Sequence, residues 1–332
     1  MGGLRGGFSG MRIAVLSATD PYAQNYFEPF VFPGGHKTET CEFVHNPSEG
    51  AFDAIVVSQS TRPLDRRYDL VCPPTRTLCA IVEPPDLLTL PDEYTRQFHT
   101  VVGPDERVVC KDRLAYAAGH HWFVELTARE ALDTPITVKP RLISAVVSSK
   151  QDTPGHRSRF ALMKRLKGHF GDRLDWFGRG VRPTGGNKLS ALADHKYHVV
   201  LENGRWPHYW TEKLSDAYMA NCFPFYWGAP NIANYFNPKS FASIDPARPD
   251  DAIRVIEDAI QTRLWERRQY ELASAREKIT SDYHPYNLWH SILDRLPKSD
   301  PAPVSIRPFN ECQFGLKQRL RFRVRNAFGY HS

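Results

Sequence analysis

The stretch that most constrains the fold covers residues 197–241 and reads YHVVLENGRWPHYWTEKLSDAYMANCFPFYWGAPNIANYFNPKSF. The apolar, β-branched run 197–201 predicts a buried strand. A second short apolar run follows at 223–227, and Thr211 between them is a good N-cap for a helix. A strand, a helix and a strand in this order are typical of a parallel sheet with crossover helices.

The helix that Thr211 caps predicts a binding site. It begins with Glu212-Lys213, and the unpaired N–H groups of a helix start together with a lysine are suited to bind phosphate. Asn203 and Tyr209 would lie at the same edge of the sheet and could bind sugar hydroxyls. The alternative is an ordinary capped helix with an exposed Glu-Lys pair. The triplet Thr211-Glu212-Lys213, taken alone, favours this alternative.

The pattern continues in both directions along the chain. Short apolar runs precede the stretch at 11–17, 41–45, 54–58, 78–82, 100–102, 142–148 and 174–177, and helical patterns lie at 157–167 and 250–279. A charged, proline-punctuated segment at 127–140 interrupts them and is the expected linker. We therefore expect an α/β protein with two Rossmann-like domains facing a central cleft. The expected division is a disordered or extra segment 1–10, an N-terminal domain 11–135, a C-terminal domain 140–300 and a basic tail 301–332.

The composition excludes several classes of protein. The chain has 332 residues, of which 41% are hydrophobic and 24% charged, as in a soluble globular protein. No apolar run reaches the roughly 18 residues of a membrane span, and no secretory segment follows the start. The six cysteines are scattered, which indicates free, packed thiols in a reducing cytoplasm.

The net charge of +6 is concentrated at the C-terminus. Residues 301–332 hold six basic residues against Glu311, so five of the six net charges lie there. A nucleic-acid-binding protein would spread a basic face over its folded body, and we therefore expect no nucleic-acid partner. The basic, partly apolar segment 317–325 could lie on the inner face of an anionic membrane, or it could pack back onto the body.

The motifs within 197–241 resemble those of glycosyltransferase family 10, the α-1,3/1,4-fucosyltransferases. The matching features are Glu202-Asn203, Pro207-x-Tyr209, Thr211-Glu212-Lys213-Leu214, Pro224-x-Tyr-Trp-Gly228-x-Pro230 and residues 234–241. A looser similarity reaches back through Arg157, Phe177-Gly-Arg-Gly180 and Asn187-Lys188, so that it covers about 140–245. The N-terminal half is only weakly similar.

The resemblance implies a fold, a donor and a set of site residues. The fold would be of GT-B type and the donor GDP-fucose. Arg157 and Lys213 match positions that contact the diphosphate. The other expected nucleotide-sugar residues are Glu202, Asn203, Tyr209, Glu212, which matches a position facing the ribose, and His156, which lies beside Arg157.

The resemblance also implies how the sugar is transferred. Two cations and a helix N-terminus can stabilise the charge on departing GDP, so we expect neither a cofactor nor a catalytic metal. Inversion needs a base, and in the family this base is a glutamate at the end of a strand. Glu83, which follows the run 78–82, takes that place here, with Asp20, Glu39 and Asp86 as weaker substitutes.

We therefore expect an inverting, cytoplasmic fucosyltransferase of bacterial type that glycosylates a lipopolysaccharide, capsule or other glycoconjugate. The alternatives are a transferase of the same fold with another nucleotide sugar and a catalytically silent glycan-binding relative. Leu201 replaces the phenylalanine that often precedes Glu-Asn. Among the other candidates, the strand spacing of His195 and His198 favours packing or solvent exposure over metal binding. For His120-His121, polar surface is favoured over an acceptor site.

Overall fold

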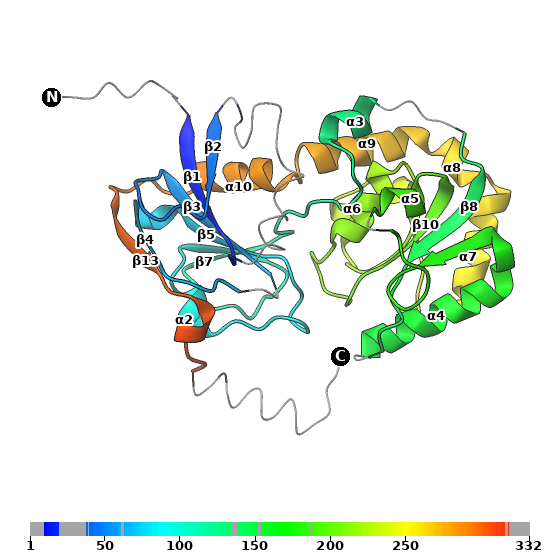
Figure 1. The fold of residues 1–332 in the computed structure, drawn as a ribbon, viewed down its shortest axis with the longest axis horizontal. Helices are drawn as coiled ribbons and strands as arrows, with labels where there is room; N and C mark the ends of the chain where they lie inside the picture. Colours follow the sequence, from blue (N-terminus) through cyan, green and yellow to red (C-terminus); the bar gives the residue numbers. More distant parts are fainter. Residues whose placement is uncertain are drawn as a thin grey trace. The chain divides into compact units, whose positions relative to one another are not determined.

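The computed structural model describes residues 10–19, 38, 40–60, 63–133, 138–151, 154–185, 187–315 and 318. They form two compact units, each with its own parallel sheet (Figure 1). The first unit contains the described residues up to Gly119 and those from Tyr286 onward, and the second runs over His120–Pro285. The weaker base candidates Asp20 and Glu39 lie outside the described residues. So does the basic segment 317–325 except for Gln318.

A six-stranded parallel sheet forms the first unit, in the order β2-β1-β3-β5-β6-β7. All residues of β3 and β5 are buried, as expected for central strands of a parallel sheet. The six strands are β1 (Met11–Leu16), β2 (Cys41–His45), β3 (Ala54–Gln59), β5 (Thr77–Ile81), β6 (Thr100–Gly103) and β7 (Asp112–Ala115). The remaining elements before the return of the chain are β4 (Tyr68–Cys72), η2 (Pro74–Arg76) and α2 (Asp92–Thr95).

The chain returns to the first unit through helix α10 (Pro285–Asp294), strand β13 (Ala302–Ile306) and η6 (Phe309–Glu311). The ring of Tyr286 stacks on Phe43 of β2 at 4.0 Å, and Trp289 donates its indole N–H to the carbonyl of Ala118 at 2.9 Å. β13 pairs with β4 in antiparallel orientation. The units therefore differ from the predicted division, which kept 140–300 in one domain, because the aromatic face of α10 packs into the core of the first unit.

The second unit is a five-stranded parallel sheet in the order β12-β11-β10-β8-β9. Its strands are β8 (Arg141–Val146), β9 (Leu174–Phe177), β10 (His195–Leu201), β11 (Phe223–Trp227) and β12 (Ala242–Ser243). The helices are α3 (Ala128–Asp133), α4 (Pro154–Phe170), α5 (Leu189–Leu192), α6 (Glu212–Met219), α7 (Pro249–Gln261), α8 (Leu264–Arg267) and α9 (Gln269–Thr280). Short 3-10 turns are η3 (Gly171–Arg173), η4 (Ile232–Asn234) and η5 (Pro238–Ser240).

Parallel pairing brings the carboxyl ends of these strands to one edge of the second sheet. β10 lies at the centre, where Val199 is in register with both Ala145 of β8 and Phe225 of β11. The crossover helices α4 and α6 follow β8 and β10 and begin at this same edge. Ligands in open α/β sheets bind beyond such an edge, so it is where the functional residues should lie.

The structure also bears on the predictions from composition. All six cysteines are free thiols, five of them buried and Cys110 half-buried, which confirms the prediction of packed, unpaired thiols. Within the described part of the chain, no helix combines the length and the apolar character that a bilayer crossing requires.

Candidate functional site

The connection from β10 to α6 is fixed by a buried carboxylate. Glu202, directly after the strand, is fully buried and accepts hydrogen bonds from the main-chain N–H of Thr211 at 2.8 Å and from its hydroxyl at 2.7 Å. Thr211 is the N-cap of α6, and its Oγ1 accepts the N–H of Lys213 at 3.4 Å. Glu202 thus determines where the helix begins, and with it the direction of the N–H groups in its first turn.

Lys213 is a fixed cation at this helix start. Its Nζ lies 3.1 Å from both Thr211 Oγ1 and Glu212 Oε1, and 3.6 Å from Glu202 Oε2. Burial alone would lower the pKa of Lys213, but the two carboxylates outweigh it and raise the pKa, so the side chain stays protonated. Burial likewise opposes ionisation of Glu212, yet Lys213 and Lys188 hold its pKa well below the usual range.

A second lysine lies beside the first. Lys188, just before α5, donates to Asp216 Oδ2 at 2.8 Å, lies 3.9 Å from Glu212 Oε1, and has its Nζ 4.6 Å from the ring centroid of Phe123. Burial raises the pKa of Asp216, and Lys188 opposes this shift. Sequence reasoning missed Lys188 as a site residue; its only signal was the Asn187-Lys188 match.

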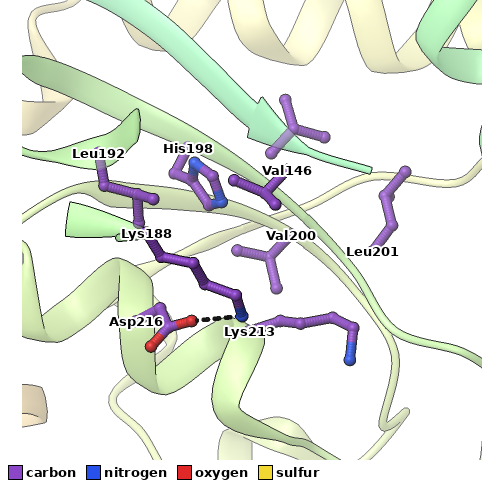
Figure 2. A pocket seen from close by; sticks show the side chains of 9 residues that line it. Val146, Lys188, Leu192, His198, Val200, Leu201, Lys213 and Asp216 are labelled. Atoms are coloured by element: carbon purple, nitrogen blue, oxygen red, sulfur yellow. Dashed lines mark hydrogen bonds and ion pairs between the residues drawn. The ribbon is translucent and has the colours of Figure 1, made fainter. Parts of the chain in front are cut away.

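The two lysines line one pocket, which is open to solvent. In Figure 2 the ammonium group of Lys188, joined to Asp216, lies near the base of Lys213, whose own side chain runs away from Lys188. The apolar side chains of Val146 and Val200 lie on the sheet side. The full lining is Val146, Lys188, Leu192, His198, Val199, Val200, Leu201, Lys213 and Asp216. Two cations beside apolar side chains suit an anionic ligand with a less polar part.

Four of the predicted site residues meet at the start of α6. Glu202 and Asn203 lie at the end of β10, while Glu212 and Lys213 form the first turn of the helix. Asn203 is half-buried, and its Oδ1 accepts a hydrogen bond from Arg159 Nη1 at 3.0 Å. Glu202 differs from the other three, because it is closed off from solvent and can act only through its neighbours.

The other predicted residues lie elsewhere. The side chain of Tyr209 is only 1% exposed, two residues before the N-cap Thr211, so it is not open to a ligand. His156 is half-buried and Arg157 is exposed in the first part of α4, where Arg157 Nη1 donates to the carbonyl of Gln151 at 3.1 Å. Glu83 is half-buried in the first unit, after the carboxyl end of β5.

The interpretation of His120 and His121 as polar surface was wrong. They are 5% and 2% exposed, and Glu212 is the carboxylate whose charge acts on both. Burial lowers the pKa of His120 to about 4 and that of His121 to about 3, against the opposing effect of Glu212. The His120 ring lies 5.7 Å from Trp210, so these residues form part of the wall around the start of α6.

Of the two predicted alternatives for His195 and His198, packing or solvent exposure, the structure shows packing. Both are buried in β10. His195 Nε2 lies 2.9 Å from Asp175 Oδ2, and His198 Nδ1 lies 2.7 Å from Ser144 Oγ. Each ring therefore joins neighbouring strands of the sheet.

Comparisons with known proteins agree with this geometry. Residues 136–252 match the family model of the glycosyltransferase family 10 (fucosyltransferase) C-terminal domain. A Helicobacter pylori alpha-(1,3)-fucosyltransferase is 42% identical over 84 residues, which are 24% of this chain and 18% of that protein. A putative fucosyltransferase of Acanthamoeba polyphaga mimivirus is 43% identical over 51 residues, 15% of this chain and 8% of that protein. The matched stretches thus span less than a fifth of either relative.

A solved structure extends the fold comparison to both units. The crystal structure of an alpha1,3-fucosyltransferase with GDP-fucose superposes with a TM-score of 0.52 at 16% identity, over 87% of this chain and 92% of that one. The protein is therefore an α/β protein of the GT-B class, as predicted. Residues 136–252, within the second unit, match the glycosyltransferase family 10 domain, in agreement with the predicted resemblance.

Proposed function

We propose that this protein is an inverting fucosyltransferase, which moves fucose from GDP-fucose to a hydroxyl group of a glycan acceptor. The observation that carries the proposal is Lys213 at the start of α6, held by Glu202 and Thr211 inside a glycosyltransferase family 10 domain. The surrounding contacts support each part of the reaction as follows.

Breakage of the sugar–phosphate bond leaves negative charge on the departing GDP. Lys213 and the N–H groups of the first turn of α6 are placed to stabilise that charge without reorganising. Lys188 adds a second cation in the same pocket. The exposed Arg157, at the start of α4, supplies a third that can close on the diphosphate. In this proposal the leaving group is stabilised by these residues, and no metal takes part in the chemistry.

The sugar and ribose hydroxyls need partners of a different kind. Glu212 is half-buried beside Lys213, and Asn203 is half-buried after the end of β10; both would contact the nucleotide sugar directly. Glu202 would act through Thr211, and the buried Tyr209 would support the wall of the site. His156 would line its edge beside Arg157.

The acceptor must lose a proton as its oxygen attacks. We assign the base to Glu83, whose carboxylate would take the acceptor O–H proton while the new bond forms to the anomeric carbon and the bond to phosphate breaks. The supporting observation is its position, half-buried after the carboxyl end of a central strand. The acceptor would be a glycan of lipopolysaccharide, capsule or protein, modified in the cytoplasm. The segment 317–325 would hold the enzyme at the inner membrane surface.

Calorimetric titration with GDP, UDP and CMP, each with and without EDTA, tests the donor. We expect GDP alone to bind, with an affinity that EDTA leaves unchanged. Transfer from GDP-fucose to an N-acetylglucosamine-containing acceptor is then measured under the same conditions. A preference for UDP would rule out GDP-fucose as the donor, and loss of binding in EDTA would overturn the metal-free reaction.

A further inference from the structure

Two arginines in the first turns of α4 have different surroundings. Arg157 is exposed, whereas Arg159 is 6% exposed and turns toward the end of β10. There its Nη1 donates to the carbonyl of Leu201 at 3.1 Å and to Asn203 Oδ1 at 3.0 Å. The buried arginine therefore joins α4 to the strand end that carries Glu202 and Asn203.

The chemistry of the guanidinium group decides how the amide of Asn203 faces. A guanidinium donates hydrogen bonds and accepts none, so the amide atom that faces it must be the oxygen. The NH₂ group of Asn203 then faces away from Arg159. Asn203 is only half-buried, so this donor is available to a ligand at the end of β10.

Burying a guanidinium group costs desolvation free energy, which its hydrogen-bond and charge partners must offset. Burial lowers the pKa of Arg159, while the negative charge of Glu202 opposes that shift. Its Nε has no hydrogen-bond partner among the residues that the structure describes. Instead, Nη1 of Arg159 donates to both acceptors, the carbonyl of Leu201 and Oδ1 of Asn203. Because both acceptors lie at the end of β10, these bonds favour a role in orienting the strand end over a role in general packing.

We propose that Arg159 is a positioning residue for donor binding. It holds the Asn203 amide with its oxygen toward Arg159 and its NH₂ group away from Arg159. The NH₂ group can then donate a hydrogen bond to an oxygen of the nucleotide sugar. The inference rests on the proposed function, because it takes a nucleotide sugar as the ligand. It assigns a role to a side chain that no sequence motif marked.

The substitution Asn203→Asp separates the two roles of the Asn203 side chain, which are to accept a hydrogen bond from Arg159 and to donate one to the ligand. A carboxylate keeps the bond from Arg159 but cannot donate to the ligand, and it places a negative charge there. Titrated with GDP and GDP-fucose, Asn203→Asp should bind the donor at least about ten-fold more weakly, the equivalent of about 1.4 kcal/mol. Its folding should be retained, because Arg159 keeps its partner. Binding of both ligands at wild-type strength would overturn the proposal.

A double-mutant cycle tests the action of Arg159 through Asn203. Arg159→Met should weaken donor binding by about three- to ten-fold, and the double variant with Asn203→Ala should bind no more weakly than Asn203→Ala alone. Arg165→Met, at an exposed residue of the same helix that pairs with Asp250, is the control. Additive losses in the cycle would show that Arg159 acts by another route.

Unfolding in urea without ligand checks the bond itself. Asn203→Ala should lower stability in the wild-type background and have little effect in the Arg159→Met background, whereas equal losses in both would refute the contact. Failure of wild-type protein to bind either ligand would overturn the proposed function together with this inference. Wild-type binding without coupling between the two residues would overturn this inference alone.

Discussion

Both carboxylate oxygens of Glu202 are occupied by one residue, Thr211, through its main-chain N–H at 2.8 Å and its hydroxyl at 2.7 Å. Because the threonine hydroxyl donates to Glu202, its lone pairs face Lys213, whose Nζ lies 3.1 Å away. A side chain with no exposed surface thus orders the N-cap and the lysine that the proposed reaction uses. The relationship predicts that Glu202 governs both stability and turnover.

Glu202→Gln places an NH₂ group against the donors of Thr211. We expect the free energy of unfolding to fall by about 1–3 kcal/mol, the usual cost of an unmatched buried polar group. Turnover should fall as well, because Lys213 loses its anchor. Urea unfolding and transfer kinetics measure the two effects, and Glu257→Gln, on the surface of α7, is the control. A Glu202→Gln variant as stable as wild type would show that the hydrogen bonds between Glu202 and Thr211 do not stabilise the start of α6.

Lys213→Met keeps most of the apolar stem of the side chain and removes its charge. We expect turnover to fall by about 10²–10³-fold, as for the loss of one group that stabilises developing charge. Circular dichroism should show a folded protein. Lys196→Met is the matched control, since Lys196 pairs with Glu266 away from this helix start. Near-wild-type turnover would contradict the donor-site assignment.

Local patterns were sufficient to predict much of the second unit. The runs 197–201 and 223–227 and the cap at Thr211 were read from short stretches, and β10, β11 and α6 occupy those places. Such features depend on side-chain alternation and on one capping hydroxyl, which neighbouring residues display. The convergence of Asn203, Glu212 and Lys213 then followed from the rule that parallel strands share a carboxyl edge.

What the sequence could not show depends on contacts between distant residues. Arg159 reaches Asn203 across 44 positions, and Lys188 reaches Asp216 across 28. The burial of His121 and the return of α10 to the first unit are likewise set by tertiary packing. No local pattern distinguishes a buried arginine from the exposed Arg157 two positions before it, and so only the structure separates their roles.

Glu83→Gln keeps the size of the proposed base and removes its ability to take a proton. We expect transfer to be abolished while GDP binding, measured by calorimetry, stays at the wild-type level. Glu106→Gln, at an exposed carboxylate of the same unit, is the control and should leave transfer intact. A Glu83→Gln variant that still transfers fucose would place the base elsewhere, and Asp86 would then be the next residue to test.

Stability should fall in mild acid because of buried histidines, of which His198 is a clear case. Burial lowers its pKa to about 3, against an ordinary value of 6.5, so the ring stays neutral in the folded protein. Below pH 6.5 the unfolded chain takes up a proton that the folded chain does not. The unfolded state is then favoured, by up to about 1.4 kcal/mol per pH unit for one such group, until the pH reaches the folded value.

His198→Gln removes this proton uptake and keeps a polar partner for Ser144 Oγ, which lies 2.7 Å from the ring. Urea unfolding at pH 7.5, 6.5, 5.5 and 4.5 should show a shallower decline for the variant than for wild type. The two curves should converge toward low pH even where the variant is less stable at neutral pH. His169→Gln, on α4 at the surface, is the control. Parallel curves for wild type and His198→Gln would show that this buried ring takes no part in the acid response, which would then rest on the other buried histidines, His120, His121, His195 and His284.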